Sequence, residues 1–134
     1  MMKTQAYLAF SGNCLEALNF YADCFNAEIK NKQTYKNAKA DIPENYRDKL
    51  QHAELVGKGI HIMAYDAAPD TPLTQGNNIH LSVDLDQEET TKALYDKLSK
   101  DGQIQHKLSE TNWNALYARL RDKYGTNWMI NCKL

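Results

Sequence analysis

The chain of 134 residues carries 16 basic and 17 acidic side chains, and its formal net charge of -1 leaves no basic excess for a nucleic-acid backbone. Hydrophobic residues make up 43% and charged residues 25%, which is typical of one globular domain with its own core. No apolar run reaches the roughly 20 residues of a membrane span, and none forms a signal peptide. We therefore expect a cytoplasmic protein that binds neither nucleic acid nor membranes.

The three cysteines are Cys14, Cys24 and Cys132, and no two of them form a CxxC pair. An odd number of cysteines without such a pair argues against a disulfide framework and predicts reduced thiols. Buried thiols are the simplest interpretation for Cys14 and Cys24, and Cys132 in the last predicted strand is expected to be a small buried residue.

The first predicted helix has the clearest signal. A short apolar run over 6–11 predicts a strand, and Asn13 then lies three residues before Glu16, as a helix cap would. Apolar residues recur on one helical face through residue 25, so we predict a helix over about 13–25. Its buried stripe consists of Cys14, Leu18, Tyr21 and Phe25.

Three further strands are predicted in the first half of the chain. They span residues 28–35, 51–56 and 60–65. The last two read as a hairpin closed by Gly57-Lys58-Gly59. The polar segment 36–49 contains a proline and predicts a long loop with room for a short helical turn.

The second half begins with a loop-like segment that contains two prolines and a glycine, and a strand over 78–85 follows it. Asp86 is the predicted cap of a second helix, and Gly102 is its predicted end. The buried stripe of this helix is predicted to be Ala93, Leu94 and Leu98. A strand over 103–108 comes next.

Local pattern does not decide the structure of residues 111–124. Apolar residues there recur at helical spacing, yet Trp113, Ala115, Tyr117 and Arg119 also share one strand face. The preceding order is strand, helix, three strands, then strand, helix, strand. Two more strands would complete a second copy of the first unit, so this order favours strands.

Four segments carry a family signal. They are Phe10 to Tyr21 with its Ser-Gly-Asn-Cys turn, Met-Ala-Tyr-Asp at 63–66, Gly-Asn-Asn-Ile-His-Leu-Ser-Val at 76–83, and the terminal hairpin at 113–132. In this order, over nearly the whole chain, they resemble the PhnB-like proteins. That family belongs to the vicinal oxygen chelate superfamily, together with glyoxalase I, bleomycin-resistance proteins and extradiol dioxygenases.

The resemblance implies an α+β fold in which two βαβββ modules form a cup-shaped, eight-stranded mixed sheet, often within a homodimer. It implies a single domain over 1–134, with the first module at 1–66, a linker at 67–77 and the second module at 78–134. PhnB-like proteins are often labelled 3-demethylubiquinone-9 3-methyltransferases. The close glycine pair of this chain lies between two strands, however, and not on the strand-to-helix turn of a nucleotide site.

Enzymes of the superfamily hold a divalent metal with His, Glu or Gln side chains from the first and last strand of each module. By resemblance, the corresponding positions here are Ala6 or Tyr7, Ile62 or Met63, Asn78 or His80, and Met129. Alanine, isoleucine and methionine are not usable ligands for such a Lewis-acid metal, and asparagine is a poor one. We therefore predict no catalytic metal and no cofactor.

A small-molecule site is predicted on the strand faces around these positions. Its candidate residues are Tyr7, Met63, Asn78, His80, Trp113, Tyr117 and Met129. The aromatic members suit a flat or apolar ligand. The other histidines are expected away from the site, with His61 and His106 outward or near turns and His52 beside a loop.

We predict a PhnB-like protein that binds a small molecule without a catalytic metal. The alternative is a metal-dependent, glyoxalase- or dioxygenase-like enzyme with an atypical site around His80, so whether the chain catalyses a reaction stays open.

Overall fold

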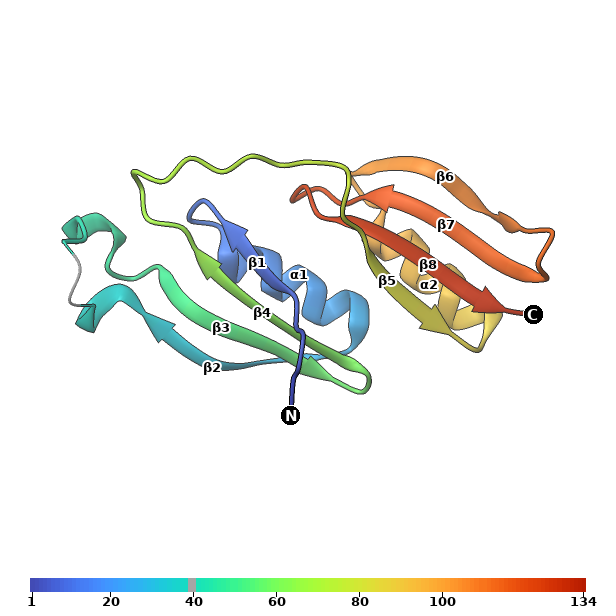
Figure 1. Cartoon of the computed structure of the whole chain (residues 1–134), viewed down its shortest axis with the longest axis horizontal. Coiled ribbons are helices and arrows are strands. Elements are labelled where there is room, and N and C mark those ends of the chain that lie inside the picture. Colours follow the sequence, from blue (N-terminus) through green and yellow to red (C-terminus); the bar gives the residue numbers. More distant parts are fainter. Residues whose placement is uncertain (39–40) are drawn as a thin grey trace. The chain divides into compact units, whose positions relative to one another are not determined.

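The computed structural model describes residues 1–38 and 41–134, which form two compact units, Met1–Thr74 and Gln75–Leu134 (Figure 1). The segment between the last strand of the first unit and the first strand of the second covers residues 67–80. Among the described residues, no helix combines the length and the apolar character needed to cross a membrane.

The first unit is a four-stranded mixed sheet with one helix. Its elements are β1 (Tyr7–Phe10), α1 (Cys14–Phe25), β2 (Glu28–Thr34), β3 (Leu50–Gly57) and β4 (Ile60–Asp66). The strand order is β1-β4-β3-β2, with β1 parallel to β4 and the other pairs antiparallel. The predicted loop at 36–49 is confirmed for its described part, which includes the short turns η1 (Tyr35–Asn37) and η2 (Glu44–Tyr46), whereas residues 39–40 lie outside the described residues.

The second unit repeats this topology. Its elements are β5 (Leu81–Leu85), α2 (Glu88–Leu98), β6 (Gln103–Glu110), β7 (Ala115–Arg121) and β8 (Asn127–Lys133). The order β5-β8-β7-β6, with β5 parallel to β8, matches the first unit strand for strand. The ambiguous segment at 111–124 therefore contains a strand, β7, rather than a helix, although Trp113 lies in the turn before it, and the predicted α+β class with two βαβββ modules is confirmed.

The core of the first unit lies between α1 and one face of its sheet. Cys14, Leu18 and Tyr21 are fully buried as predicted, and Ala17 joins them, whereas Phe25 is only half-buried. The strand residues that alternate toward the helix are also buried. They include Ala53, Leu55, Ile62 and Ala64.

Three expectations for α2 are wrong. The helix starts after Gln87 rather than Asp86, and no side chain caps it, while Ala93 is exposed. Thr91 is buried beside Leu94 and Leu98 instead, because its hydroxyl donates to the Gln87 carbonyl oxygen at 2.6 Å and no longer needs water.

Gly102 does not end α2 either. The left-handed residue after the helix is Asp101, with φ of 61°. Gly102 is required for a close approach of two segments, because a Cβ there would lie 2.3 Å from the Arg121 carbonyl oxygen.

Each sheet has a second face that its own helix does not cover, which we call its open face (Figure 1). On β4, His61, Met63 and Tyr65 alternate with the buried residues and so belong to the open face. On β7 and β8, Tyr117 and Met129 do the same. These faces carry most of the candidate site residues.

Candidate functional site

The open face of the first sheet carries a continuous hydrogen-bonded network centred on Glu54. One carboxylate oxygen of Glu54 lies 2.7 Å from His61 Nε2, and the other lies 3.2 Å from His52 Nε2 and 2.9 Å from Asn31 Nδ2. The side-chain nitrogen of Gln5 lies 2.8 Å from His61 Nδ1. The Tyr7 hydroxyl lies 2.5 Å from His52 Nδ1. We call these six residues the Glu54 network.

Strand geometry brings the central members together. His52 and Glu54 are two apart on β3, so they point to the same face. The hairpin register pairs Val56 with His61 and Glu54 with Met63, which places His61 diagonally beside Glu54.

The outer members come from β1 and β2. Tyr7 on β1 pairs in parallel with Met63, and Gln5 precedes that strand. Asn31 has a φ of 55° at an irregularity in the pairing of β2 with β3, where the register shifts between Lys30 and Gln33. Such an irregularity re-aims a side chain, and here the Asn31 amide reaches Glu54.

Neutral imidazoles satisfy every contact in the network. If each Nε2 carries the proton, His52 and His61 both donate to the Glu54 carboxylate. Each Nδ1 is then an acceptor, which receives the Tyr7 hydroxyl at His52 and the Gln5 amide at His61. This assignment gives every ring nitrogen of His52 and His61 a complementary partner.

The electrostatics of the network follow from these bonds. Hydrogen bonds from His61, Asn31 and His52 lower the pKa of Glu54 from 4.5 to about 2, so its carboxylate is ionised at neutral pH. Partial burial, with smaller contributions from Tyr65, Cys14 and Glu54, raises the pKa of Tyr7, which stays a neutral phenol.

Two predicted site residues, Tyr7 and Met63, lie on this face. Tyr7 is 47% exposed, and its ring meets the rings of Tyr65 and His52 edge-on, with centroids 5.4 Å and 5.6 Å away. Met63 is half-buried on the neighbouring strand. The result is a partly exposed aromatic surface beside an ionised carboxylate.

Sequence reasoning missed most of the Glu54 network. His61 and His52 were not among the candidate residues, yet both are hydrogen-bonded in this network, because the hairpin register turns them toward the same carboxylate. Glu54 was not a candidate at all. The available signal was the His-x-Glu spacing on β3, followed by a histidine two residues after the glycine turn.

On the open face of the second sheet the chemistry is aromatic and basic. Trp113 lies in the turn before β7, is 61% exposed, and meets the Tyr117 ring at a centroid distance of 5.9 Å. The His106 ring is 5.1 Å from the same ring. Arg119, paired in register with Met129, donates a long 3.4 Å hydrogen bond to the Tyr117 hydroxyl.

Two further candidates, Asn78 and His80, precede β5 instead of lying on it. The side chains of Asn127 and Arg121 both donate to the Gly76 carbonyl oxygen, at 2.8 Å and 2.7 Å, and hold this segment against the sheet. Asn78 is exposed, whereas the Nε2 atom of His80 is buried without a described hydrogen-bond partner.

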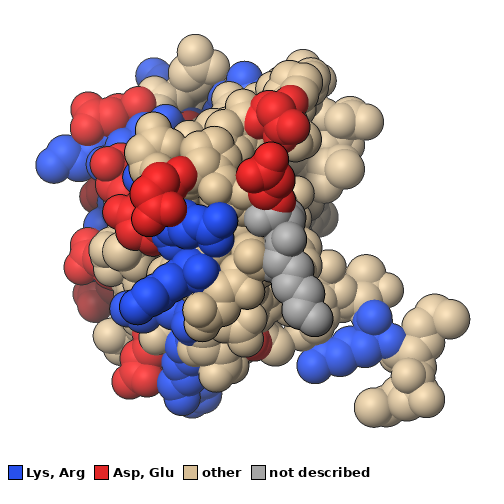
Figure 2. Space-filling model, turned by 90° about the vertical axis from the view of Figure 1, so that its left-hand side faces the viewer, with Lys and Arg blue, Asp and Glu red and all other residues tan. Residues whose placement is uncertain are grey.

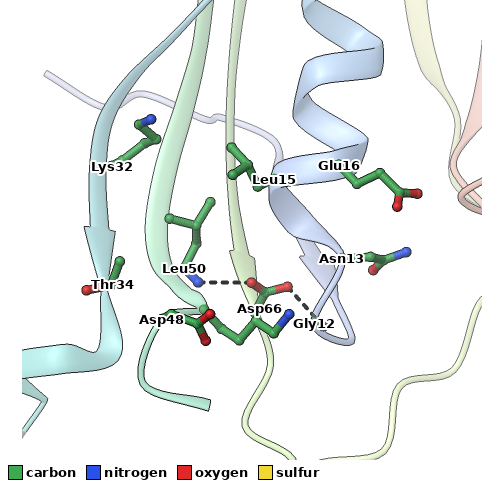
Figure 3. A pocket seen from close by; sticks show the side chains of 10 residues that line it. Gly12, Asn13, Leu15, Glu16, Lys32, Thr34, Asp48, Leu50 and Asp66 are labelled. Carbon is green, nitrogen blue, oxygen red and sulfur yellow. Dashed lines mark hydrogen bonds between the residues drawn. The ribbon is translucent and has the colours of Figure 1, made fainter. Parts of the chain in front are cut away.

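A separate pocket of about 430 Å³ opens on the helix side of the first sheet, at the start of α1 (Figure 3). The Asp66 carboxylate forms its floor and accepts hydrogen bonds from the backbone N–H groups of Gly12, Cys14 and Leu50, each at 2.9 Å. Acidic and basic side chains alternate on the surface around this end of the unit (Figure 2). The pocket is not part of either open face.

The cysteine thiols offer no nucleophile in this region. Cys14 is fully buried, and burial together with the charge of Asp66 raises its pKa to about 12, so it stays protonated. Cys132 is buried as predicted, whereas Cys24 is only half-buried.

The residues that the resemblance aligns with metal positions do not fit a divalent metal. The first and last strands of the two modules present Tyr7, Met63 and Met129, and His80 stands alone before β5. Within residues 1–38 and 41–134, no group of three or more His, Cys, Asp or Glu side chains could hold a metal ion. The His52, Glu54 and His61 side chains therefore do not form such a group.

Comparison with known proteins places this chain among relatives of similar length. Residues 2–131 match the sequence model of the family described as 3-demethylubiquinone-9 3-methyltransferase. Protein YjdN from Escherichia coli (strain K12) is 29% identical over 144 residues, which cover 97% of this chain and 95% of YjdN.

Solved structures agree. Protein PA1353 from Pseudomonas aeruginosa has a TM-score of 0.87 at 28% identity, over 99% of this chain and 98% of its own. A putative 3-demethylubiquinone-9 3-methyltransferase, PhnB protein, from Bacillus cereus has a TM-score of 0.82 at 26% identity, over 98% and 99%. A glyoxylase/bleomycin resistance protein/dioxygenase domain from Frankia sp. EAN1pec shares the fold alone, with a TM-score of 0.70 at 11% identity over 100% and 98%. The chain therefore belongs to the 3-demethylubiquinone-9 3-methyltransferase, or PhnB-like, family and has the glyoxalase/bleomycin resistance fold.

Proposed function

We propose that this protein binds a small organic molecule on the open faces of its sheets, without a catalytic metal. The observation that carries the proposal is the composition of these faces. They combine partly exposed aromatic rings, Tyr7 and Trp113 above all, with hydrogen-bonding side chains in fixed positions. Apolar surface with a few placed polar groups is typical of ligand sites.

The methionines and histidines of the two faces support ligand binding rather than metal-dependent catalysis. Methionines at 63 and 129 occupy positions where superfamily enzymes have metal ligands, and they supply adaptable apolar surface. The histidines of the first sheet already share their ring nitrogens with Glu54, Tyr7 and Gln5.

The alternative, a metal-dependent enzyme around His80, has less support. Because Leu81 pairs with Trp128, the neighbours of His80 on β8 are Asn127 and Met129, which add no strong metal ligand.

Methyl transfer, which the family description names, lacks a nucleotide-binding turn in the described fold. The β1–α1 turn uses the N–H groups of Gly12 and Cys14 to bind Asp66, so these groups are not available for a phosphate or carboxylate of a cofactor.

The test is a melting experiment on tag-free protein against two panels. The first contains Zn, Ni, Fe, Mn and Mg salts, with metal content measured before the additions, and the second contains small aromatic and polar molecules. A ligand that binds the folded state raises the melting temperature by mass action. We expect one class of small molecule to raise it, with no metal required.

Variants then locate the binding. Tyr7→Ala and Trp113→Ala each remove an exposed ring from one open face, and we expect at least one of them to reduce the affinity about tenfold or more. Lys92→Gln, on the exposed side of α2, is the matched control and should leave the affinity unchanged. Near-stoichiometric metal that is lost in His80→Ala would favour the enzyme instead. A negative result with every small molecule would remove the proposal.

A further inference from the structure

The Glu54 network directs its hydrogen-bond donors inward. The Tyr7 hydroxyl and the Nε2 protons of both histidines are used within the network, as is one N–H of Asn31. The groups left for a ligand are mainly acceptors, namely the second lone pair of the Tyr7 oxygen, the Gln5 carbonyl and the remaining lone pairs of Glu54. Such a surface recognises a molecule that brings its own donors.

The charge of the network depends on its imidazoles. In the Nε2–H form described above both rings are neutral, and with the Asn31 amide they stabilise the Glu54 carboxylate without cancelling its negative charge, whereas a protonated ring would form an ion pair with it. The basic residue opposite Glu54 on β2 is Lys30, and it forms its ion pair with Glu28 at 3.8 Å. Among the described residues, no lysine or arginine forms an ion pair with Glu54.

Aromatic rings border this charge. Tyr7 and Tyr65 pack edge-to-face, and Tyr7 remains 47% exposed beside the network. The face of a tyrosine ring attracts a cation, more strongly when both are partly removed from water. The side chain of Glu54 is itself only 18% exposed, so water screens its charge less than at an open surface.

From these three features we propose that the open face of the first sheet, at Glu54, Tyr7 and Tyr65, is a site for a small organic cation such as an amidinium, guanidinium or substituted ammonium. The inference rests on the proposed function, because it assigns a ligand class to one of the two open faces. A planar cation with N–H groups would donate to the Glu54 and Tyr7 oxygens and stack on the tyrosine ring.

Benzamidine and benzamide provide the test, because they share a phenyl ring and nearly one shape but differ by one positive charge. Their affinities are measured by titration calorimetry at pH 8 and low salt. We expect benzamidine to bind at least tenfold more tightly than benzamide. Glu54→Gln should abolish this preference, whereas Glu28→Gln, an exposed acid on the adjacent strand, should retain it.

Further variants keep the result interpretable. Glu54→Asp retains the charge, so it should preserve part of the preference even if the altered network lowers stability, and Tyr7→Ala should weaken the binding of benzamidine by loss of the ring. Melting curves establish that each variant is folded.

Equal affinity for the two probes at this face would overturn the cation inference and leave the proposed function standing. Failure of benzamidine to bind at concentrations up to the millimolar range, or an unchanged preference in folded Glu54→Gln, would also overturn it. The proposed function is judged separately by the melting panel and the Trp113→Ala variant.

Discussion

The two units share a topology but differ in the chemistry of their open faces. In the first unit an ionised carboxylate, Glu54, lies among neutral donors and tyrosines. In the second unit the residues around Tyr117 are Trp113, His106 and Arg119, which makes that face aromatic and basic. The repeat of the backbone therefore fixes where side chains point, while the identity of a few residues on each face decides what it can bind.

Each unit also has one buried aspartate, used in a different way. Asp66 at the end of β4 accepts backbone N–H groups from the β1–α1 turn and from the start of β3, which lie 16 to 54 residues away in sequence. Asp122 accepts from Tyr124, Thr126 and the Trp128 indole, all within six residues. The first aspartate joins distant segments, whereas the second shapes one hairpin.

The largest predicted effect separates these two aspartates. Asp66→Ala leaves three N–H groups without their acceptor in or near the core, so we expect the free energy of unfolding to fall by about 3–5 kcal/mol. Asp122→Ala should cost less, roughly 2–3 kcal/mol, because its hairpin can relax locally. Urea unfolding followed by tryptophan fluorescence and circular dichroism measures both.

Asp66→Asn is the control for this comparison. It retains one acceptor oxygen and should lose less stability than Asp66→Ala. A smaller loss for Asp66→Ala than for Asp122→Ala would show that the long-range bonds add little beyond local turn formation.

A second comparison concerns the turn that follows each helix. In the first unit Gly57, on β3, lies opposite Ala27, which precedes β2. In the second unit the glycine is on the other side of the contact, because Gly102 precedes β6 and lies opposite Asp122, which follows β7. A Cβ at Gly57 would lie 2.9 Å from Ala27 Cβ, and a Cβ at Gly102 would lie 2.3 Å from the Arg121 carbonyl oxygen.

We expect Gly102→Ala to destabilise the protein by about 2–3 kcal/mol, because an added Cβ at 2.3 Å from the Arg121 carbonyl oxygen overlaps it more deeply than one at 2.9 Å from Ala27 Cβ. Gly57→Ala should cost about 1 kcal/mol. Gly76→Ala, whose Cβ would lie 3.4 Å from the nearest atom, Asn78 Oδ1, is the matched control with little effect. Chemical unfolding of the three variants measures these losses. A larger loss of unfolding free energy in Gly57→Ala than in Gly102→Ala would contradict the comparison.

The fold could be predicted because its main signals are local or repeated. The apolar stripe of α1 follows a helical period, and the glycine turn between β3 and β4 identifies a hairpin. Residues 115–121 needed the repeat as well, since Trp113 to Tyr124 fits a helix equally well by spacing. The predicted buried stripe of α2 was wrong for a different reason. Threonine is a polar residue, and Thr91 is buried because its hydroxyl donates to the Gln87 carbonyl oxygen, a bond that apolar spacing does not predict.

The site was predictable only in part. The family resemblance singled out Tyr7, Met63 and Met129, strand parity added Tyr117, and all four belong to the open faces. Neither could give the Glu54 network, since that depends on the register of β3 with β4 and on the irregular backbone at Asn31. Asn78 and His80 were misplaced because side chains of the β7–β8 hairpin, distant in sequence, hold the segment before β5.

The smallest predicted effect tests whether the Glu54 charge distinguishes the first open face. Its pKa is about 2 when folded and 4.5 without its partners, so an unfolded chain binds this proton more readily. The stabilisation that Glu54 supplies is therefore complete above about pH 4.5 and is lost as pH falls toward 2. We expect the difference in melting temperature between the unaltered protein and Glu54→Gln to shrink across that window.

Glu28→Gln provides the reference for the same scans, since Glu28 is exposed and makes only a long ion pair with Lys30. Its melting temperature should follow that of the unaltered protein from pH 7 to pH 2. If the Glu54→Gln difference stayed constant with pH, the histidine and asparagine bonds would not lower the pKa of Glu54 in the folded state. The carboxylate of the first open face would then titrate as it does in the unfolded chain, and the network would add nothing to its ionisation.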